Sequence, residues 1–76
     1  LKQGQADLKA VVDDPDAAKP ENVQDAVRAA VNLGVSHELA GDVEAAKKVV
    51  AEAKAKFPAH DYIFDAQLER LNDAPA

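Results

Sequence analysis

Residues 32–42, NLGVSHELAGD, allow two incompatible interpretations of this chain. In the first, His37-Glu38 begins an H-E-x-x-H zinc motif, in which two histidines one helical turn apart bind the metal. In the second, Gly41 ends one helix in a left-handed conformation and the Asp42 carboxylate caps the next helix. The second motif histidine would have to stand at position 41, which is glycine. Because zinc usually takes three or four ligands, the stretch predicts a helical hairpin instead.

Apolar residues on both sides of this turn recur at spacings of three and four, the period of an amphipathic helix. Pro20 suits a first helical position, so we expect the hairpin helices to run over 20–40 and 43–57. Their apolar stripes consist of Val23, Ala26, Val27, Ala30, Val31 and Gly34 in the first helix and Val43, Ala46, Val49, Val50, Ala53 and Phe57 in the second.

The segments before and after the hairpin predict two further helices. Residues 1–13 bring apolar side chains near one face, which favours a helix from about Gln3 to Asp13. After Phe57-Pro58, we expect a last helix that begins near His60-Asp61 and runs from Asp61 to Asn72, with Asp61 as its cap. The apolar residues concerned are Leu1, Leu8, Val11 and Val12 in the first segment and Ile63, Phe64, Ala66, Leu68 and Leu71 in the last.

The acidic stretch 14–19 separates the first helix from the hairpin. Pro15 and Pro20 both disfavour helix in the residue that precedes them, so we expect a linker with at most one short turn of helix. The domain organisation is then an N-terminal helix over 1–13, a linker over 14–19, the hairpin with its C-terminal capping helix over 20–72, and a tail over 73–76.

The composition fits an all-α fold, a small antiparallel bundle of about four helices built round this hairpin. Hydrophobic residues make up 47% of the 76 residues, but many are alanine and only 4% are aromatic. Alanine is the best helix former, whereas sheets favour β-branched and aromatic residues. A chain this short buries only about 60% of its unfolded surface, so a partner chain or flanking sequence could complete the thin core.

The net charge of −5 and the pI near 4.8 exclude classes of partner that need a basic surface. Nucleic acids and anionic membranes both recruit proteins through clustered lysine and arginine, so we expect neither as a partner. The sequence shows no signal peptide and no apolar run near the roughly 18 residues of a membrane span. We expect a soluble piece of a longer protein, cytoplasmic by default.

The hairpin resembles the tetratricopeptide repeat, a family of stacked helix pairs with small and apolar residues at fixed spacings. The resemblance covers residues 27–60, about one repeat, and implies that Gly34 and Ala46 touch where the two helices cross closely. Residues one repeat length further on resemble the capping helix of such arrays. The positions whose spacing matches are Ala30, Leu33-Gly34, Ala46, Val50, Ala53 and Pro58, with Phe64, Leu68 and Leu71 in the cap. The residue type differs at Ala30, His37 and Val50, where the family commonly has an aromatic residue.

The remaining candidate sites lack the residues that their chemistry needs. His60 beside Asp61 reads as the start of a helix rather than a ligand. The acidic residues Asp13, Asp14 and Asp16 lack the central glycine and the twelfth-position glutamate of a calcium-binding EF-hand loop. The chain contains one serine, Ser36, and no threonine or cysteine. We therefore expect no catalytic, cofactor-binding or metal site, and a chain that is not itself an enzyme.

The helix predicted over 43–57 carries four lysines and two glutamates, a net charge of +2 that leaves −7 for the rest of the chain. A solvated outer face is the ordinary explanation of such a charge run. The alternative is electrostatic pairing with an acidic partner or with a neighbouring copy. Favourable i,i+4 ion pairs are expected between Glu44 and Lys48 and between Glu52 and Lys56.

The resemblance implies a binding strip on the first hairpin helix, the helix that lines the concave face in that family. The strip consists of Arg28, Val31, Asn32, Val35 and Leu39. Valines at 31 and 35 replace the lysine and asparagine with which some relatives hold acidic chaperone tails, so that ligand is not expected. The two valines could instead receive an apolar segment, or the helix over 3–13 could cover them.

Three functions are compatible with these features. The first is a protein-interaction module, a scaffold or adaptor that recognises a peptide or helix of a partner protein. The second is a homo-oligomerisation domain, in which a thin core is completed by another copy. The third is a non-catalytic helical accessory domain of an enzyme.

Overall fold

The computed structural model describes residues 2–73 and confirms an all-α fold with four helices. The elements are α1 (Lys2–Asp13), α2 (Val23–Leu39), α3 (Val43–Lys56), the short 3₁₀ helix η1 (Pro58–His60) and α4 (Asp61–Asn72). This part of the chain contains no strand. Leu1 and the tail residues 74–76 lie outside the described part, so the predictions that fall on them are not addressed.

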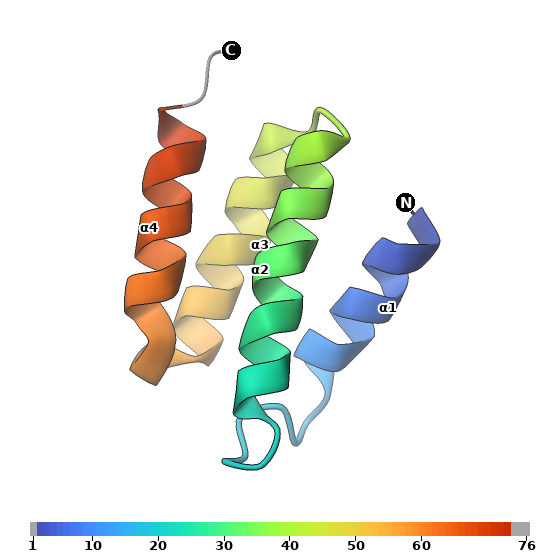
Figure 1. Ribbon diagram of the computed structural model, residues 1–76, viewed down its shortest axis with the longest axis vertical. Helices are drawn as coiled ribbons and strands as arrows, with labels where there is room; N and C mark the ends of the chain where they lie inside the picture. Colours follow the sequence, from blue (N-terminus) through green and yellow to red (C-terminus); the bar gives the residue numbers. More distant parts are fainter. Residues whose placement is uncertain (1, 74–76) are drawn as a thin grey trace.

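The helices form a flat arrangement of 37 × 27 × 13 Å in which α2 takes the central place (Figure 1). α1 and α4 lie on opposite sides of α2, and α3 lies behind it in this view. The main packing contacts join α2 to α3, α1 to α2 and α3 to α4, whereas α1 and α3 barely touch. Helix α1 is thus held mainly by α2, and this arrangement leaves space between α1 and α3.

The turn between α2 and α3 has the predicted geometry. Gly41 has a φ of +87°, in the left-handed region that glycine tolerates best. The Asp42 N–H donates to the His37 carbonyl at 2.9 Å and the Gly41 N–H to the Glu38 carbonyl at 3.0 Å, which together make a Schellman motif. The Asp42 carboxylate then accepts the Ala45 N–H at 3.1 Å and caps α3.

One predicted helix start and one predicted cap were wrong, whereas α4 has the predicted bounds, Asp61–Asn72. Helix α2 begins at Val23 rather than Pro20, because the N–H groups of Asn22 and Val23 both donate to the Lys19 carbonyl at 2.8 Å and close a turn before the helix. Asp61 does not cap α4: the cap position belongs to His60, which ends η1, and Asp61 stands in the first helical turn. Its acidic side chain still lies where the helix dipole favours negative charge.

The core contains most of the predicted stripes of α2, α3 and α4, together with Ala29, Leu33 and two residues from the N-terminal part; Ala66 of the predicted α4 stripe is exposed. Phe57 and Phe64 are fully buried, and their rings lie tilted with centroids 6.4 Å apart. Val12 of α1 and Ala17 of the linker both belong to this core. The linker is therefore not entirely solvated. Val11 is an exception to the predicted face of α1, since 43% of it is exposed.

Helices α2, α3 and α4 meet at Gly34. A Cβ atom at this position would lie 2.8 Å from Val50 Cγ2 and 2.7 Å from Gln67 Nε2. The predicted close approach therefore exists, but its nearest neighbours are Val50 and Gln67 rather than Ala46, which is buried without being among them. The missing side chain lets Gln67, buried in α4, reach α2 and donate to the Val31 carbonyl at 3.0 Å.

Substitution of Gly34 by alanine is expected to destabilise the fold by about 1–3 kcal/mol, because the added methyl overpacks the junction with Val50 and Gln67. This loss outweighs the gain in helix propensity of about 1 kcal/mol. Gly4→Ala is the matched control: it makes the same change in helix α1, where nothing lies within 4 Å of the new Cβ. Chemical denaturation of both variants should show opposite signs, and a stabilised Gly34→Ala would contradict the close junction.

Candidate functional site

The two histidines lie in separate parts of the molecule. His37 is half-buried on α2, and its Nδ1 lies 3.5 Å from Gln5 Nε2 of α1. His60 precedes α4, and its buried Nδ1 has no hydrogen-bond partner. No group of three or more potential metal ligands occurs among residues 2–73. His37 thus lies against α1, beside the hairpin interface, as a packing role predicts.

Two residues of the predicted binding strip on α2, Arg28 and Val31, lie beside α4. Arg28, Asn32 and Leu39 are exposed, and Leu39 is 76% exposed. Val31 and Val35 are half-buried. Arg28 and Val31 share a shallow hollow of about 400 Å³ with Tyr62 and Ile63, from the start of α4. At Val31 the neighbouring helix is therefore α4, whereas the α1 side of α2 carries Ala30, Leu33 and His37.

A larger groove, of about 640 Å³, lies between α1 and α3. Helix α2 provides its floor, and the sparse contact between α1 and α3 leaves it open. Most of its inner surface is apolar, and several of the side chains are small. The apolar lining residues are Val12 of α1, Ala30 and Leu33 of α2, and Ala45, Val49 and Ala53 of α3.

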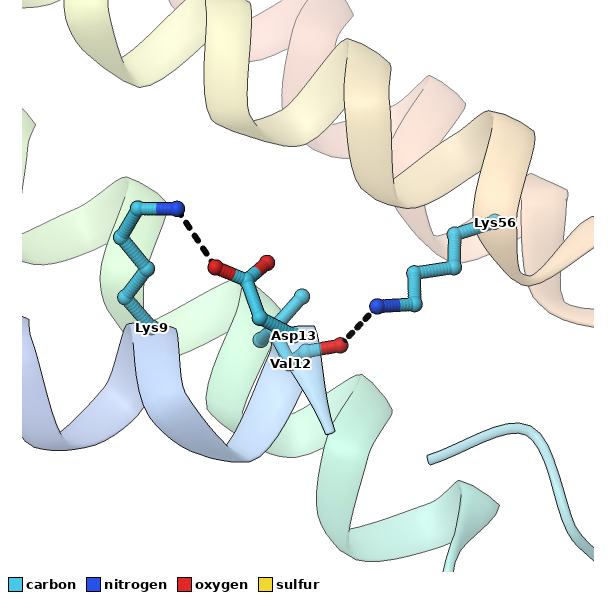
Figure 2. A network of polar contacts seen from close by, with 4 residues as sticks. All are labelled: Lys9, Val12, Asp13 and Lys56. Carbon is cyan, nitrogen blue, oxygen red and sulfur yellow. Dashed lines mark hydrogen bonds and ion pairs between the residues drawn. The ribbon is translucent and has the colours of Figure 1, made fainter. Parts of the chain in front are cut away.

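One end of this groove is closed by a polar link between α1 and α3. Figure 2 shows the Lys56 ammonium of α3 reaching the backbone carbonyl of Val12, in the last turn of α1. That carbonyl belongs to the helix end that lacks intrahelical partners, and a cation there also suits the helix dipole. Beside it, Lys9 and Asp13 form an ion pair of 2.5 Å within α1 (Figure 2).

The lysines of α3 do not form the predicted i,i+4 pairs. Lys47 pairs with Glu44 at 3.8 Å, and Lys54 reaches Asp65 of α4 at 2.6 Å. Lys56 is directed to α1 instead of Glu52. Lys48 has no carboxylate within ion-pair distance in the described part of the chain. Lys54 and Lys56 therefore contact other helices while Lys47 pairs within α3, so part of the lysine run has a structural role.

Two ion pairs perturb the titration of their members. The hydrogen bond and the charge of Asp13 raise the pKa of Lys9, and the hydrogen bond from Lys9 lowers the pKa of Asp13. The hydrogen bond and the charge of Asp65 raise the pKa of Lys54 in the same way. All of these groups lie at the surface, so their effect on stability is small.

No protein-family model matches this chain, and no curated protein or solved structure matches it either. None of the helices in residues 2–73 is long and apolar enough to cross a membrane.

The groove between α1 and α3 was not among the sites predicted from sequence. Its wall residues come from helices that are separated by the linker, and the spacing along one helix says nothing about how far α1 stands from α3. The one available signal was the unexplained lysine run of α3, since Lys48 and Lys56 both line the groove.

Replacing Lys56 with alanine should loosen α1 more than the rest of the fold. The variant loses the bond to the Val12 carbonyl, which we expect to be worth about 0.5–1 kcal/mol. Amide hydrogen exchange should speed up in α1 and remain slow in α2 and α3. Lys48→Ala on the same helix is the control and should leave α1 exchange unchanged. Equal effects of the two variants would exclude the link as an anchor of α1.

The Asp13 carboxyl should titrate below the usual aspartate value of 3.8, because Lys9 stabilises its charged form. The small stability that this pair contributes is complete above the unfolded-state pKa and is lost as the pH falls through the lowered folded-state pKa. Carboxyl NMR titration of the protein and of Lys9→Ala measures the shift, which should disappear in the variant. An unchanged Asp13 midpoint in Lys9→Ala would assign the shift to another cause.

Proposed function

We propose that this domain is a non-catalytic protein-interaction module that holds a helical segment of a partner protein in the groove between α1 and α3. The observation that carries the proposal is the groove itself: about 640 Å³ of open space with a largely apolar inner surface on a small helical domain. A concave space of this size, with a mostly apolar lining and a few polar side chains at its rim, has the form in which binding sites usually occur.

The dimensions of the groove favour a helix as its occupant. Its lining residues on α3 run from Ala45 to Lys56, which corresponds to about 16 Å, or three helical turns. Small side chains at Ala30, Ala45 and Ala53 leave room for large apolar anchors of an incoming helix. An amphipathic helix that lays its apolar face into such a groove is a common mode of peptide recognition.

The predicted strip on α2 is a second candidate surface for the same class of function. Leu39 is 76% exposed at one end of the strip, and Tyr62, beside the hollow at its other end, is 65% exposed. The resemblance to tetratricopeptide repeats favours this face, whereas the volume and apolar lining favour the groove between α1 and α3. The two sites lie on different sides of α2, so one experiment can separate them.

A synthetic 12-residue amphipathic peptide with leucine and alanine on one face is the probe for that experiment. We expect its addition to shift the backbone NMR signals of Ala30, Val49 and Ala53. The variant Ala45→Phe, which fills the groove with a larger side chain, should weaken binding at least about tenfold. The matched variant Val35→Lys alters the strip and should leave binding within about twofold. Thermal melts confirm that both variants remain folded.

The outcomes distinguish the alternatives. Shifts centred on Val31, Val35 and Leu39, abolished by Val35→Lys, would place the site on the strip. No shift on either surface at millimolar peptide would overturn the proposed function. Sedimentation over a concentration series separates it from homo-oligomerisation, since a stable monomer at every concentration excludes self-association as the function.

A further inference from the structure

The charges round the groove between α1 and α3 indicate which kind of helix fits it. Three lysines and two acidic residues line its rims, in a protein whose net charge is −5. The rim is therefore positively charged in a protein that is acidic elsewhere. The basic residues are Lys9, Lys48 and Lys56, and the acidic residues are Asp13 and Glu52.

Most cations in the described part of the chain are already paired with a carboxylate. Lys9, Lys19, Lys47, Lys54 and Arg70 each form an ion pair within the chain. Arg28, Lys48 and Lys56 have no carboxylate within 4.0 Å among these residues, and Lys56 contacts only a neutral carbonyl. Two of these three side chains line the groove, whereas Arg28 lies at the hollow beside α4.

Lys48 and Lys56 stand on one rim at a defined separation. Eight residues along α3 correspond to about 12 Å, or slightly more than two helical turns. Glu52 lies midway between them, and its negative charge disfavours a further carboxylate on the partner helix opposite this position. The rim thus favours a partner helix with carboxylates two turns apart and a neutral or basic residue between them.

We propose that the segment held in the groove between α1 and α3 is an acidic amphipathic helix. Its apolar face contacts the half-buried Ala45 and Val49, and two carboxylates spaced by seven or eight residues pair with Lys48 and Lys56. This inference rests on the proposed function and adds to it the chemistry of the partner. Because the Lys56 ammonium carries three N–H donors, it can bind a partner carboxylate and keep its bond to the Val12 carbonyl.

Three synthetic 12-residue helices with the same leucine and alanine face provide the test. They carry glutamate, glutamine or lysine at two positions eight residues apart on the flank. We expect the glutamate peptide to bind about three- to tenfold more tightly than the glutamine peptide, as two exposed ion pairs predict, and the lysine peptide to bind most weakly. Raising the salt concentration to about 1 M should reduce this preference.

Charge reversal on the protein identifies the rim that is responsible. Lys48→Glu should weaken the glutamate peptide by about tenfold and strengthen the lysine peptide, because this exposed side chain faces the groove. Arg28→Glu makes the same change in charge at the hollow beside α4 and should alter neither affinity by more than about twofold. Circular dichroism checks that both variants keep their helix content.

The results separate this inference from the proposed function. Binding of all three peptides in the groove within twofold of one another would overturn the acidic partner and leave the proposed function standing. If no peptide shifts the groove signals, both fail. A fatty acid such as decanoate that binds the groove more tightly than every peptide would also overturn the inference, by making an anionic amphiphile the ligand. If the NMR signals of the groove residues shift when the protein concentration alone is raised, the groove binds a second copy of this chain.

Discussion

The close contact of α2 with α3 and α4 at Gly34 is the constraint on which the rest of the structure depends. Any side chain at this position would meet Val50 and Gln67 at less than 3 Å. The glycine lets α3 pack directly on α2 and lets the Gln67 amide cross from α4 to the Val31 carbonyl. Three helices are thereby fixed around one point, although the core contains few large side chains: the fully buried ones are Phe57, Phe64, Leu71 and Val50.

Helix α1 stands outside this junction, and its position leaves the groove between α1 and α3. It packs on α2 through Val12 and meets α3 mainly through the link from Lys56. A larger apolar contact would have drawn α1 onto α3 and closed the space. The polar link instead fixes one end of α1 and leaves open a groove of about 640 Å³ with a largely apolar lining. The attachment of α1 and the proposed binding site are thus two results of the same geometry.

The roles of the charged side chains follow from this arrangement of the helices. The lysines of α3 look equivalent along the helix, but the structure divides them into three roles. Lys47 and Lys54 are neutralised by carboxylates, Lys56 caps the end of α1, and Lys48 is exposed at the rim of the groove without an ion pair among residues 2–73. A net charge of −5 therefore coexists with a basic rim, and this contrast is the basis for proposing an acidic partner.

The sequence by itself determined the helices and the turn between α2 and α3, because these depend on local rules. Helical spacing gave the core stripes, and Gly41 with Asp42 specified the turn through φ and capping. The start of α2 and the capping residue of α4 were missed, since hydrogen bonds to Lys19 and the position of His60 override the local signals of Pro20 and Asp61. Only the tertiary structure decided the partners of Gly34, the buried role of Gln67 and the groove between α1 and α3. These features depend on distances between segments far apart in the chain, which no spacing within one helix can fix.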